Sequence, residues 1–363
     1  MSELKVDKVS PRTGTYVALN TVGSKNIIIN GDMSIAQRGT STASITSSGY
    51  YTVDRFQTSL ISSGTWTQSQ ETDVPTGQGF ISSVKMDCTT ANGSLSTGSF
   101  MLFHQKFEGQ NLQYLKKGTA SAESLTLSFW VKSSKTGTYI CELFDQDNTR
   151  QISKSYTIDS ASTWEKKTIT FAGDTTGTLD NDNGNSFELN FWLVAGSNYS
   201  SGTLSTTWTS STNANRAVGQ VNLADNTAND WYITGVQLEA GTTASDFEFL
   251  PYDMNLLRCQ RYYYKLKASD NYTNFLQAAW RATNDARAVV PFPVTMRAIG
   301  SLSTTGTLAS LGNGTYSSLQ LADNGSEYQG TIRVNGSGAT TGYSTTIRAN
   351  NDATAAISFD AEL

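Results

Sequence analysis

The side chains best suited to chemistry in this chain of 363 residues are a single histidine and several neighbouring carboxylates. A Ser-His-Asp or Cys-His catalytic site would have to use His104, because the sequence has no other histidine. His104 alternates with Phe103 and Gln105 on an expected strand, which favours a structural or surface role. One histidine also argues against a histidine-based zinc site.

Paired carboxylates are the remaining route to catalysis. Glycosidases place two Asp or Glu side chains roughly 5–10 Å apart around the bond that they cleave. Glu142, Asp145 and Asp147 are the candidates, around one expected hairpin. Solvated turn carboxylates are far more common than catalytic pairs, and we find no P-loop or G-x-S-x-G pattern. We therefore predict that the protein is not an enzyme, with a polysaccharide depolymerase as the alternative.

One loop has the composition of a calcium site. The run DNDNG at 180–184 places oxygen ligands, with Asp180 and Asp182 among them, in a turn that ends in glycine. It lacks the later bidentate glutamate of an EF-hand. A structural calcium ion and an ordinary solvated hairpin both remain open for this loop.

Aromatic residues in polar loops suggest carbohydrate binding. A sugar site needs an aromatic face that stacks on a pyranose ring, with amides and carboxylates that bond its hydroxyls. The alternative for each aromatic is that it covers a sandwich edge or a subunit interface. The candidate glycan-binding residues are Tyr50, Tyr51, Trp66, Tyr199 and Trp208.

Composition excludes several classes of protein. The net charge of −5 disfavours binding to nucleic acid. No stretch approaches the roughly 20 apolar residues that span a bilayer, so we expect no membrane insertion, and the N-terminus carries no apolar signal region. Cys88, Cys141 and Cys259 are too far apart for a metal motif and too few for a disulfide framework, which favours small buried side chains.

Short strands with a two-residue apolar rhythm are the main signal between residues 26 and 250. Such strands, with little helical periodicity, predict an all-β fold: an antiparallel jelly-roll β-sandwich. Trp130 and Trp192 alternate with apolar neighbours, so we expect both to point away from the main core, toward a subunit interface or a binding face. The expected strands are 26–30, 51–57, 125–131, 138–144, 164–171, 186–194 and 231–238.

Several of these strands resemble those of jelly-roll carbohydrate-binding modules. NIIINGD at 26–32 is similar to their opening strand, LTLSFWVKSS at 125–134 to a central strand, and DWYITGVQLEAG at 230–241 to the closing strand. These modules often hold a structural calcium near the first and last strands. The resemblance therefore implies calcium ligands at Asp32 and Asp230, with turn capping and a strand-edge side chain as the alternatives.

Most of residues 1–265 also resembles phage tail-fibre-like proteins, in consistent order. This resemblance implies a virion protein, assembled in the cytoplasm of a bacterial host. The matching stretches are LKVDKVSP at 4–11, AQRGT at 36–40, VDR at 53–55, EG at 108–109, FWVKSS at 129–134, VQLEAG at 236–241 and CQRYYY at 259–264.

The chain divides into three expected parts. Residues 1–25 form an attachment or trimerisation arm or a flexible leader, 26–250 the sandwich, and 251–363 a smaller C-terminal β domain. Asp253 is an expected N-cap for a short helix over 253–260. Asn-Gly pairs at 313–314, 324–325 and 335–336 predict hairpin turns. The low apolar content of this last part suggests that two other copies of the chain complete its core, so we predict a homotrimer.

Together these observations predict a fibre or appendage subunit of a phage virion that binds a host-surface glycan as its receptor. Its expected partners are two further copies of itself, other virion proteins through the N-terminal arm, and host-surface polysaccharide. A structural head or tail decoration without receptor binding is the principal alternative.

Overall fold

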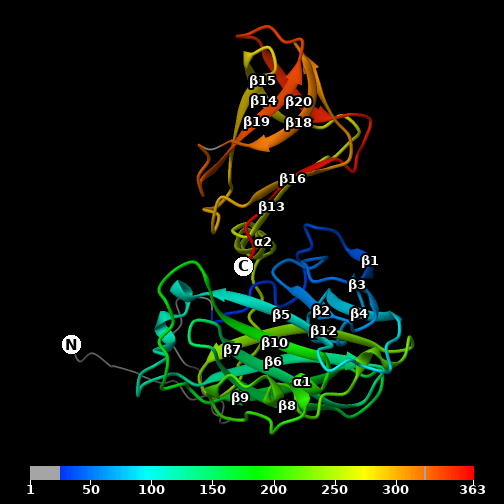
Figure 1. The fold of residues 1–363 in the computed structure, drawn as a ribbon, viewed down its shortest axis with the longest axis vertical. Helices are drawn as coiled ribbons and strands as arrows, with labels where there is room; N and C mark the ends of the chain where they lie inside the picture. The colour runs from blue at the N-terminus through cyan, green and yellow to red at the C-terminus, as the bar shows by residue number, and fades with distance from the viewer. Residues whose placement is uncertain (1–24, 323) are drawn as a thin grey trace, which may run out of the picture.

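The computed structural model describes residues 25–322 and 324–363. Strands hold 45% of the residues and helices 7%, which confirms the all-β prediction. Every strand ladder is antiparallel within the described residues. The predicted N-terminal arm lies outside the described residues except for Lys25. Figure 1 shows a large sandwich below and a smaller β domain above, joined beside the helix α2 (Tyr252–Gln260).

Two six-stranded sheets form the sandwich. In spatial order, the first sheet contains β1 (Ser41–Ile45), β3 (Thr65–Glu71), β4 (Ser83–Thr90), β12 (Asp230–Ala240), β6 (Leu125–Ser133) and β9 (Glu165–Phe171). The second contains β11 (Thr209–Ser210), β8 (Arg150–Ile158), β7 (Gly137–Asp145), β10 (Asn185–Ala195), β5 (Phe100–Glu108) and β2 (Gln57–Ile61). The chain crosses repeatedly between the sheets, as in the step from β4 to β5 and on to β6, so each sheet combines segments from distant parts of the sequence.

Alternating side chains from the two sheets meet in the main core. Phe129 on β6 lies 5.1 Å from Phe191 on β10, ring centre to ring centre. Phe191 in turn lies 6.0 Å from Trp231 on β12. Successive strand residues point to opposite faces, so the period-two apolar rhythm becomes a continuous buried layer.

The helical segments of the sandwich are short and lie in its loops. They are η1 (Gly109–Asn111), η2 (Gln113–Leu115), α1 (Ser197–Ser200), η3 (Asn213–Asn215) and η4 (Leu223–Asp225). None of the described helices combines the length and the apolar character needed to cross a membrane.

Two expected strands of the sandwich are wrong. Residues 26–30 run beside β12 but form no ladder with it. The side-chain amide of Asn26 donates to the Val236 carbonyl instead, where the pairing register of β12 is irregular. Residues 51–56 form turns in which Arg55 adopts a φ of 73°, and the strand begins only at Gln57. In both segments, hydrogen bonds to distant residues replace strand pairing, and the local apolar character of the sequence did not reveal this.

The C-terminal domain contains a three-stranded and a six-stranded sheet. The first is ordered β13 (Tyr263–Lys267), β21 (Ala356–Asp360) and β16 (Ser301–Thr305). The second is ordered β17 (Leu308–Gly312), β20 (Ser344–Ala349), β14 (Asn274–Ala282), β15 (Asp285–Pro291), β19 (Gln329–Ser337) and β18 (Thr315–Leu321). The edge strands β17 and β18 are joined by only Asn313 and Gly314, so this sheet curls until its two edges meet there.

Two local predictions for this domain are corrected. Pro251, with extended backbone angles, occupies the N-cap of α2, and Asp253 lies inside the first turn. Asn335 and Gly336 lie within β19 and form no turn. A Cβ at Gly336 would come within 2.6 Å of the Trp280 ring, so this glycine permits close packing on the tryptophan.

Ion pairs join the two domains. Arg55 of the sandwich pairs with Glu362, and its guanidinium lies 3.4 Å from the centre of the Tyr262 ring. Arg261 donates to both oxygens of Glu108 at 2.7 and 2.6 Å. These contacts hold the C-terminal domain at one end of the neighbouring strands β2 and β5, because Arg55 precedes β2 and Glu108 is the last residue of β5.

Candidate functional site

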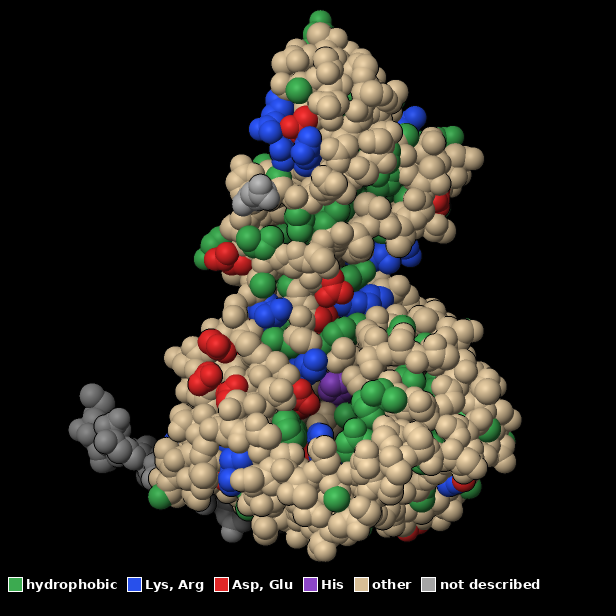
Figure 2. Space-filling view, viewed as in Figure 1, with side chains coloured by type: hydrophobic (Ala, Val, Ile, Leu, Met, Phe, Trp, Pro, Cys, Tyr) green, Lys and Arg blue, Asp and Glu red, His purple; other side chains and the backbone are tan. Residues whose placement is uncertain are grey.

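A hollow of about 290 Å³ lies on the outer face of the second sheet, the face that points away from the main core. We call it the outer-sheet hollow. Figure 2 shows it just below the junction of the two domains, where the only histidine side chain lies beside a group of apolar side chains. Its lining residues are Gln57, Ser59, Phe100, Leu102, His104, Lys106, Phe144, Gln146, Glu188, Trp192, Tyr199 and Arg216.

Aromatic rings form one wall of the hollow. The Tyr199 ring lies 5.3 Å from the Trp192 ring and 5.6 Å from the Phe100 ring, centre to centre. Leu102 and Ile140 complete a small hydrophobic cluster that is separate from the main core. The expectation that Trp192 points away from the main core is confirmed, because it follows Phe191 on β10 and so takes the opposite face.

A row of four polar side chains runs across the outer face of the second sheet, and two of them, Gln57 and His104, line the hollow. The antiparallel register places Gln57 opposite His104, His104 opposite Asn190, and Asn190 opposite Glu142. These four residues come from β2, β5, β10 and β7, which are distant in the sequence. Pairing of the strands therefore builds a polar row that no single segment contains.

Glu142 is the anchor of this row and is fully buried. Arg216, which follows η3, donates to both carboxylate oxygens at 2.8 Å. Asn190 and Trp192 donate to the same carboxylate at 3.1 and 3.2 Å. Burial alone would lower the pKa of Arg216, but the Glu142 charge outweighs that effect and raises it. The pair is therefore a fixed, charge-balanced support.

The guanidinium of Arg216 also lies against aromatic rings. Its central carbon is 4.6 Å from the centre of the Phe144 ring and 5.2 Å from that of Trp192. Stacked in this way, the side chain closes one side of the hollow while its charge stays paired.

His104 is held neutral. Burial, with smaller contributions from the charges of Lys106 and Arg216, lowers its pKa to about 3. Its Nε2 lies 2.9 Å from the hydroxyl oxygen of Ser59. Its Nδ1 is buried and has no hydrogen-bond partner among the described residues. The neutral imidazole therefore adds no charge to the lining of the hollow.

Three buried polar atoms of the row have no partner within the described parts of the chain. They are the Nδ1 of His104, the Oε1 of Gln57 and the Oδ1 of Asn190. Buried polar groups are nearly always hydrogen-bonded, so three exceptions in adjacent residues need an explanation such as enclosed water. Two of the three atoms are oxygens, which accept hydrogen bonds from hydroxyl groups.

Of the predicted glycan-binding residues, only Tyr199 lies in the hollow. The Tyr50 hydroxyl donates to the Leu363 carbonyl at 3.1 Å, at the domain junction. Tyr51 packs against the main core. The Trp208 indole donates to the Ala172 carbonyl at 2.8 Å, away from the lining residues.

Trp66 was wrongly expected in an exposed loop. It lies on β3 with none of its surface exposed, and its indole donates to the Ser63 carbonyl at 2.9 Å. Its neighbours on β3, Thr65, Thr67 and Gln68, are all polar, so no local apolar alternation marked the ring as buried. The alternation of Phe187, Leu189 and Phe191 along β10 was the available signal that Trp192 faces outward, but the sequence did not show which strands are its neighbours.

The three candidate catalytic carboxylates do not form a common cleft. Glu142 is held by Arg216, whereas Asp145 is paired with Lys117. Asp147 accepts a hydrogen bond from the Asp180 amide at 2.8 Å. Each carboxylate thus has a structural partner of its own.

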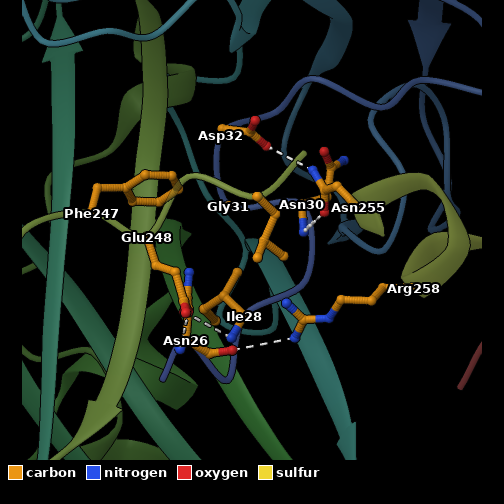
Figure 3. Close-up of a pocket in the computed structure, with 10 residues that line it drawn as sticks. Asn26, Ile28, Asn30, Gly31, Asp32, Phe247, Glu248, Asn255 and Arg258 are labelled. Carbon is orange, nitrogen blue, oxygen red and sulfur yellow. Dashed lines mark hydrogen bonds between the residues drawn. The ribbon is translucent and has the colours of Figure 1, made fainter. Parts of the chain in front are cut away.

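The four predicted metal ligands have separate partners as well. Asp32 accepts from the Asn255 amide at 3.0 Å, in a space of about 10 Å³ (Figure 3). Asp230 accepts from the Ser134 amide at 3.1 Å. Asp182 accepts from the Gly184 amide at 2.8 Å, and the backbone carbonyl of Asp180 accepts from Gln113 at 3.1 Å.

Within residues 25–322 and 324–363, no group of three or more His, Cys, Asp or Glu side chains is arranged to hold a metal ion. A calcium site among these residues would therefore depend largely on carbonyl oxygens or water. Calcium binding stays a prediction.

No protein-family profile matches the chain, and no curated protein sequence matches it. Among solved structures, the enzymatically active domain of tailspike protein 4 from bacteriophage CBA120 has a TM-score of 0.30 and 16% identity. That match covers 60% of this chain and 21% of the other, so this chain spans about a fifth of the tailspike structure's length.

Carbohydrate-binding modules are matched at a similar level. TmCBM61 in complex with β-1,4-galactotriose has a TM-score of 0.32 and 10% identity, over 60% of this chain and 99% of the module. A family 11 module from Clostridium thermocellum, in complex with a β-1,3-1,4-mixed-linked tetrasaccharide, has a TM-score of 0.27 and 13% identity, over 57% and 99%. At these TM-scores the comparisons do not define a shared fold.

Proposed function

We propose that this chain is a non-enzymatic appendage subunit of a phage particle, and that it binds host-surface glycan in the outer-sheet hollow. The observation that carries the proposal is the hollow itself, in which an aromatic wall meets polar lining residues such as Gln57, Gln146 and Arg216. Sugars have apolar ring faces and polar hydroxyl edges, so they suit this combination.

The charges of the hollow favour a neutral sugar. Arg216 is balanced by Glu142, and Lys106 lies opposite Glu188 in the strand register. Lys106 also donates to the Leu363 carbonyl at 3.0 Å. Since no net charge remains among these four groups, recognition would rest on ring stacking and on hydroxyl hydrogen bonds.

Assignment to a phage particle rests on the sequence resemblance to tail-fibre-like proteins. The proposed assembly is a homotrimer in which the N-terminal arm contacts other virion proteins. Imaging of the intact particle would test both points, because three copies at one attachment site are expected. A monomeric protein absent from the particle would contradict this part of the proposal.

Glycan binding is tested with purified full-length protein on an array of bacterial surface polysaccharides, followed by calorimetry with the best neutral oligosaccharide. Tyr199→Ala should weaken binding about tenfold, since a lost stacking contact costs about 1.4 kcal/mol. Trp208→Ala is the matched control, because this ring is also partly buried but lies outside the hollow. Equal losses in both variants, or no binding by the wild type, would favour a structural decoration protein.

The same samples distinguish binding from cleavage. We expect no new reducing ends and no loss of viscosity when the polysaccharide is incubated with the protein, because the candidate carboxylates each have a structural partner. Release of reducing ends would favour the depolymerase alternative.

A further inference from the structure

A cluster of arginines lies on the C-terminal domain, far from the aromatic wall of the hollow. Figure 2 shows basic side chains gathered around an acidic group on the upper domain. Nitrogen atoms of Arg281, Arg287 and Arg333 lie 2.8, 3.3 and 3.4 Å from carboxylate oxygens of Asp285. We call these four residues the arginine patch.

Strand pairing brings the patch together on the outer face of the six-stranded sheet. Arg287 on β15 lies directly opposite Arg333 on β19. Asp285 is two residues before Arg287 and therefore shares its face. Like charges directly opposite each other destabilise a strand pair. The Arg287–Arg333 pair is therefore either offset only by ion pairs with Asp285 or has a role that needs its positive charge.

The patch carries excess positive charge. Burial tends to raise the pKa of Asp285, but the hydrogen bond from Arg281 and the charges of Arg287 and Arg333 hold it below its usual value. Asp285 is thus anionic, and three guanidinium groups share one carboxylate. The whole chain has a net charge of −5, so this surface is a local exception.

Neighbouring strands supply no second carboxylate. Ala279 lies opposite Arg287 on β14, and Gln320 lies opposite Arg333 on β18. Among the described residues, Asp285 is the only acidic side chain within ion-pair distance of the three arginines.

Donor groups in the patch are also left over. The Nε atoms of Arg287 and Arg333 are buried against Oδ1 of Asp285, at 3.3 and 3.4 Å, so a ligand would not reach them. The terminal nitrogens of the guanidinium groups are the donors that a ligand could meet. The side chains of Arg281 and Arg333 are 62% and 40% exposed, so part of each guanidinium is accessible from solvent.

We propose that the arginine patch binds an oxyanion, a carboxylate or a phosphate group, carried by an acidic polysaccharide. The planar guanidinium fork matches the oxygen pairs of both groups, and bidentate pairs are the strongest charge-assisted hydrogen bonds. This site is independent of the outer-sheet hollow, whose charges are balanced. The two surfaces would bind a neutral and an acidic part of a polymer, respectively.

The test titrates the full-length protein with trigalacturonate, sodium phosphate and neutral maltotriose at low ionic strength, and follows arginine Nε–H resonances by NMR. We expect one or both anionic probes to shift the Arg287 and Arg333 resonances saturably. The affinity should decrease as sodium chloride is added, because salt screens exposed charges. Shifts with trigalacturonate alone would identify carboxylate, and shifts with phosphate alone would identify phosphate.

Variants separate a binding site from a structural ion cluster. Arg287→Gln and Arg333→Gln should each lower the affinity for the anionic probe about tenfold, the usual effect of losing a charged hydrogen bond. Arg348→Gln is the matched control, because Arg348 lies on the same sheet near Tyr272 and outside the patch. It should change the affinity less than about twofold, as expected for a distant surface charge.

Arg333→Lys keeps the positive charge but loses the planar guanidinium fork, so we expect an intermediate loss of affinity for the anionic probe. Circular dichroism checks that each variant is folded. The proposal is overturned if no anionic probe binds more tightly than maltotriose. It is equally overturned if Arg348→Gln lowers the affinity as much as the patch variants do.

Discussion

The two domains share antiparallel strands but fill their cores differently. The sandwich core is rich in aromatic rings, such as Phe103, whose centre lies 4.9 Å from Phe56 and 5.8 Å from Trp231. The core of the C-terminal domain contains many small side chains. Its buried alanines are Ala268, Ala278, Ala286, Ala288, Ala339, Ala349, Ala355 and Ala361.

This difference shows that a period-two pattern specifies sheets without specifying how much stability they gain. An aromatic side chain buries about 150–250 Å², whereas an alanine contributes only one methyl group. The C-terminal domain must therefore depend mainly on its larger residues, of which Trp280 is fully packed. Its close contacts with Gly314 and Gly336 indicate that the curled sheet closes around this ring.

The largest expected effect comes from removing that ring. Trp280→Ala should cost about 3–5 kcal/mol, the usual range for a buried tryptophan, and it also removes the hydrogen bond from the indole to the Asn313 carbonyl. In a small domain this loss should abolish the C-terminal unfolding transition and leave that of the sandwich in place. Scanning calorimetry of the full chain measures both.

Phe103→Ala is the matched control in the aromatic core. It should cost a similar amount and lower only the sandwich transition, because the large core retains many other rings. If both variants lower a single common transition by the same amount, the two cores are not independent and the comparison fails.

A second prediction concerns added volume. Ala286 is fully buried on β15, so Ala286→Leu should destabilise the C-terminal domain by about 1–3 kcal/mol through overpacking. Ala279→Leu, at an exposed position of β14, is the control and should change stability by less than about 0.5 kcal/mol. A neutral or stabilising Ala286→Leu would mean that the small-residue core contains unused space.

The smallest expected effect is a pH dependence confined to the sandwich. The pKa of His104 is lowered to about 3 in the fold, against about 6.5 in an unfolded chain. Below pH 6.5 the unfolded chain binds a proton that the folded protein does not, so this stability is present above pH 6.5 and is lost on acidification. Between pH 7 and pH 6 the loss is roughly 0.7 kcal/mol.

His104→Gln should remove this slope, measured as the difference between urea unfolding curves of the variant and the wild type at the two pH values. Ser59→Ala keeps the imidazole and should keep the slope. An unchanged slope in His104→Gln would show that another group of the same sign titrates in this range, which excludes Asp54. Its pKa is raised by burial to about 6, so it acts with the opposite sign.

Sequence patterns predicted much of the fold. The alternation at 125–131, 138–144 and 186–194 correctly predicted β6, β7 and β10, because an alternating strand that faces a core has one favourable orientation. The short helix after Pro251 is confirmed as well. The strand expected at 26–30 was wrong because polar side chains there, such as Asn26, replace backbone pairing.

The candidate site was much less predictable. Loop aromatics were chosen because they look exposed, yet Trp66 is in the core and Tyr50 lies at the domain junction. Tyr199 alone was both predicted and found in the hollow. Residues on the strands, such as His104, were read as structural because a polar outer face looks the same whether it meets solvent or a ligand.

The sequence by itself determined which face of each strand is apolar, since side chains alternate along any extended backbone. Which strands became neighbours was decided only by the tertiary structure. His104, Asn190 and Glu142 form a row, and Arg287 meets Arg333, because hydrogen-bonded ladders align segments that are distant along the chain. A shift of one residue in either register would turn these side chains to the opposite face, and local sequence carries little information about that register.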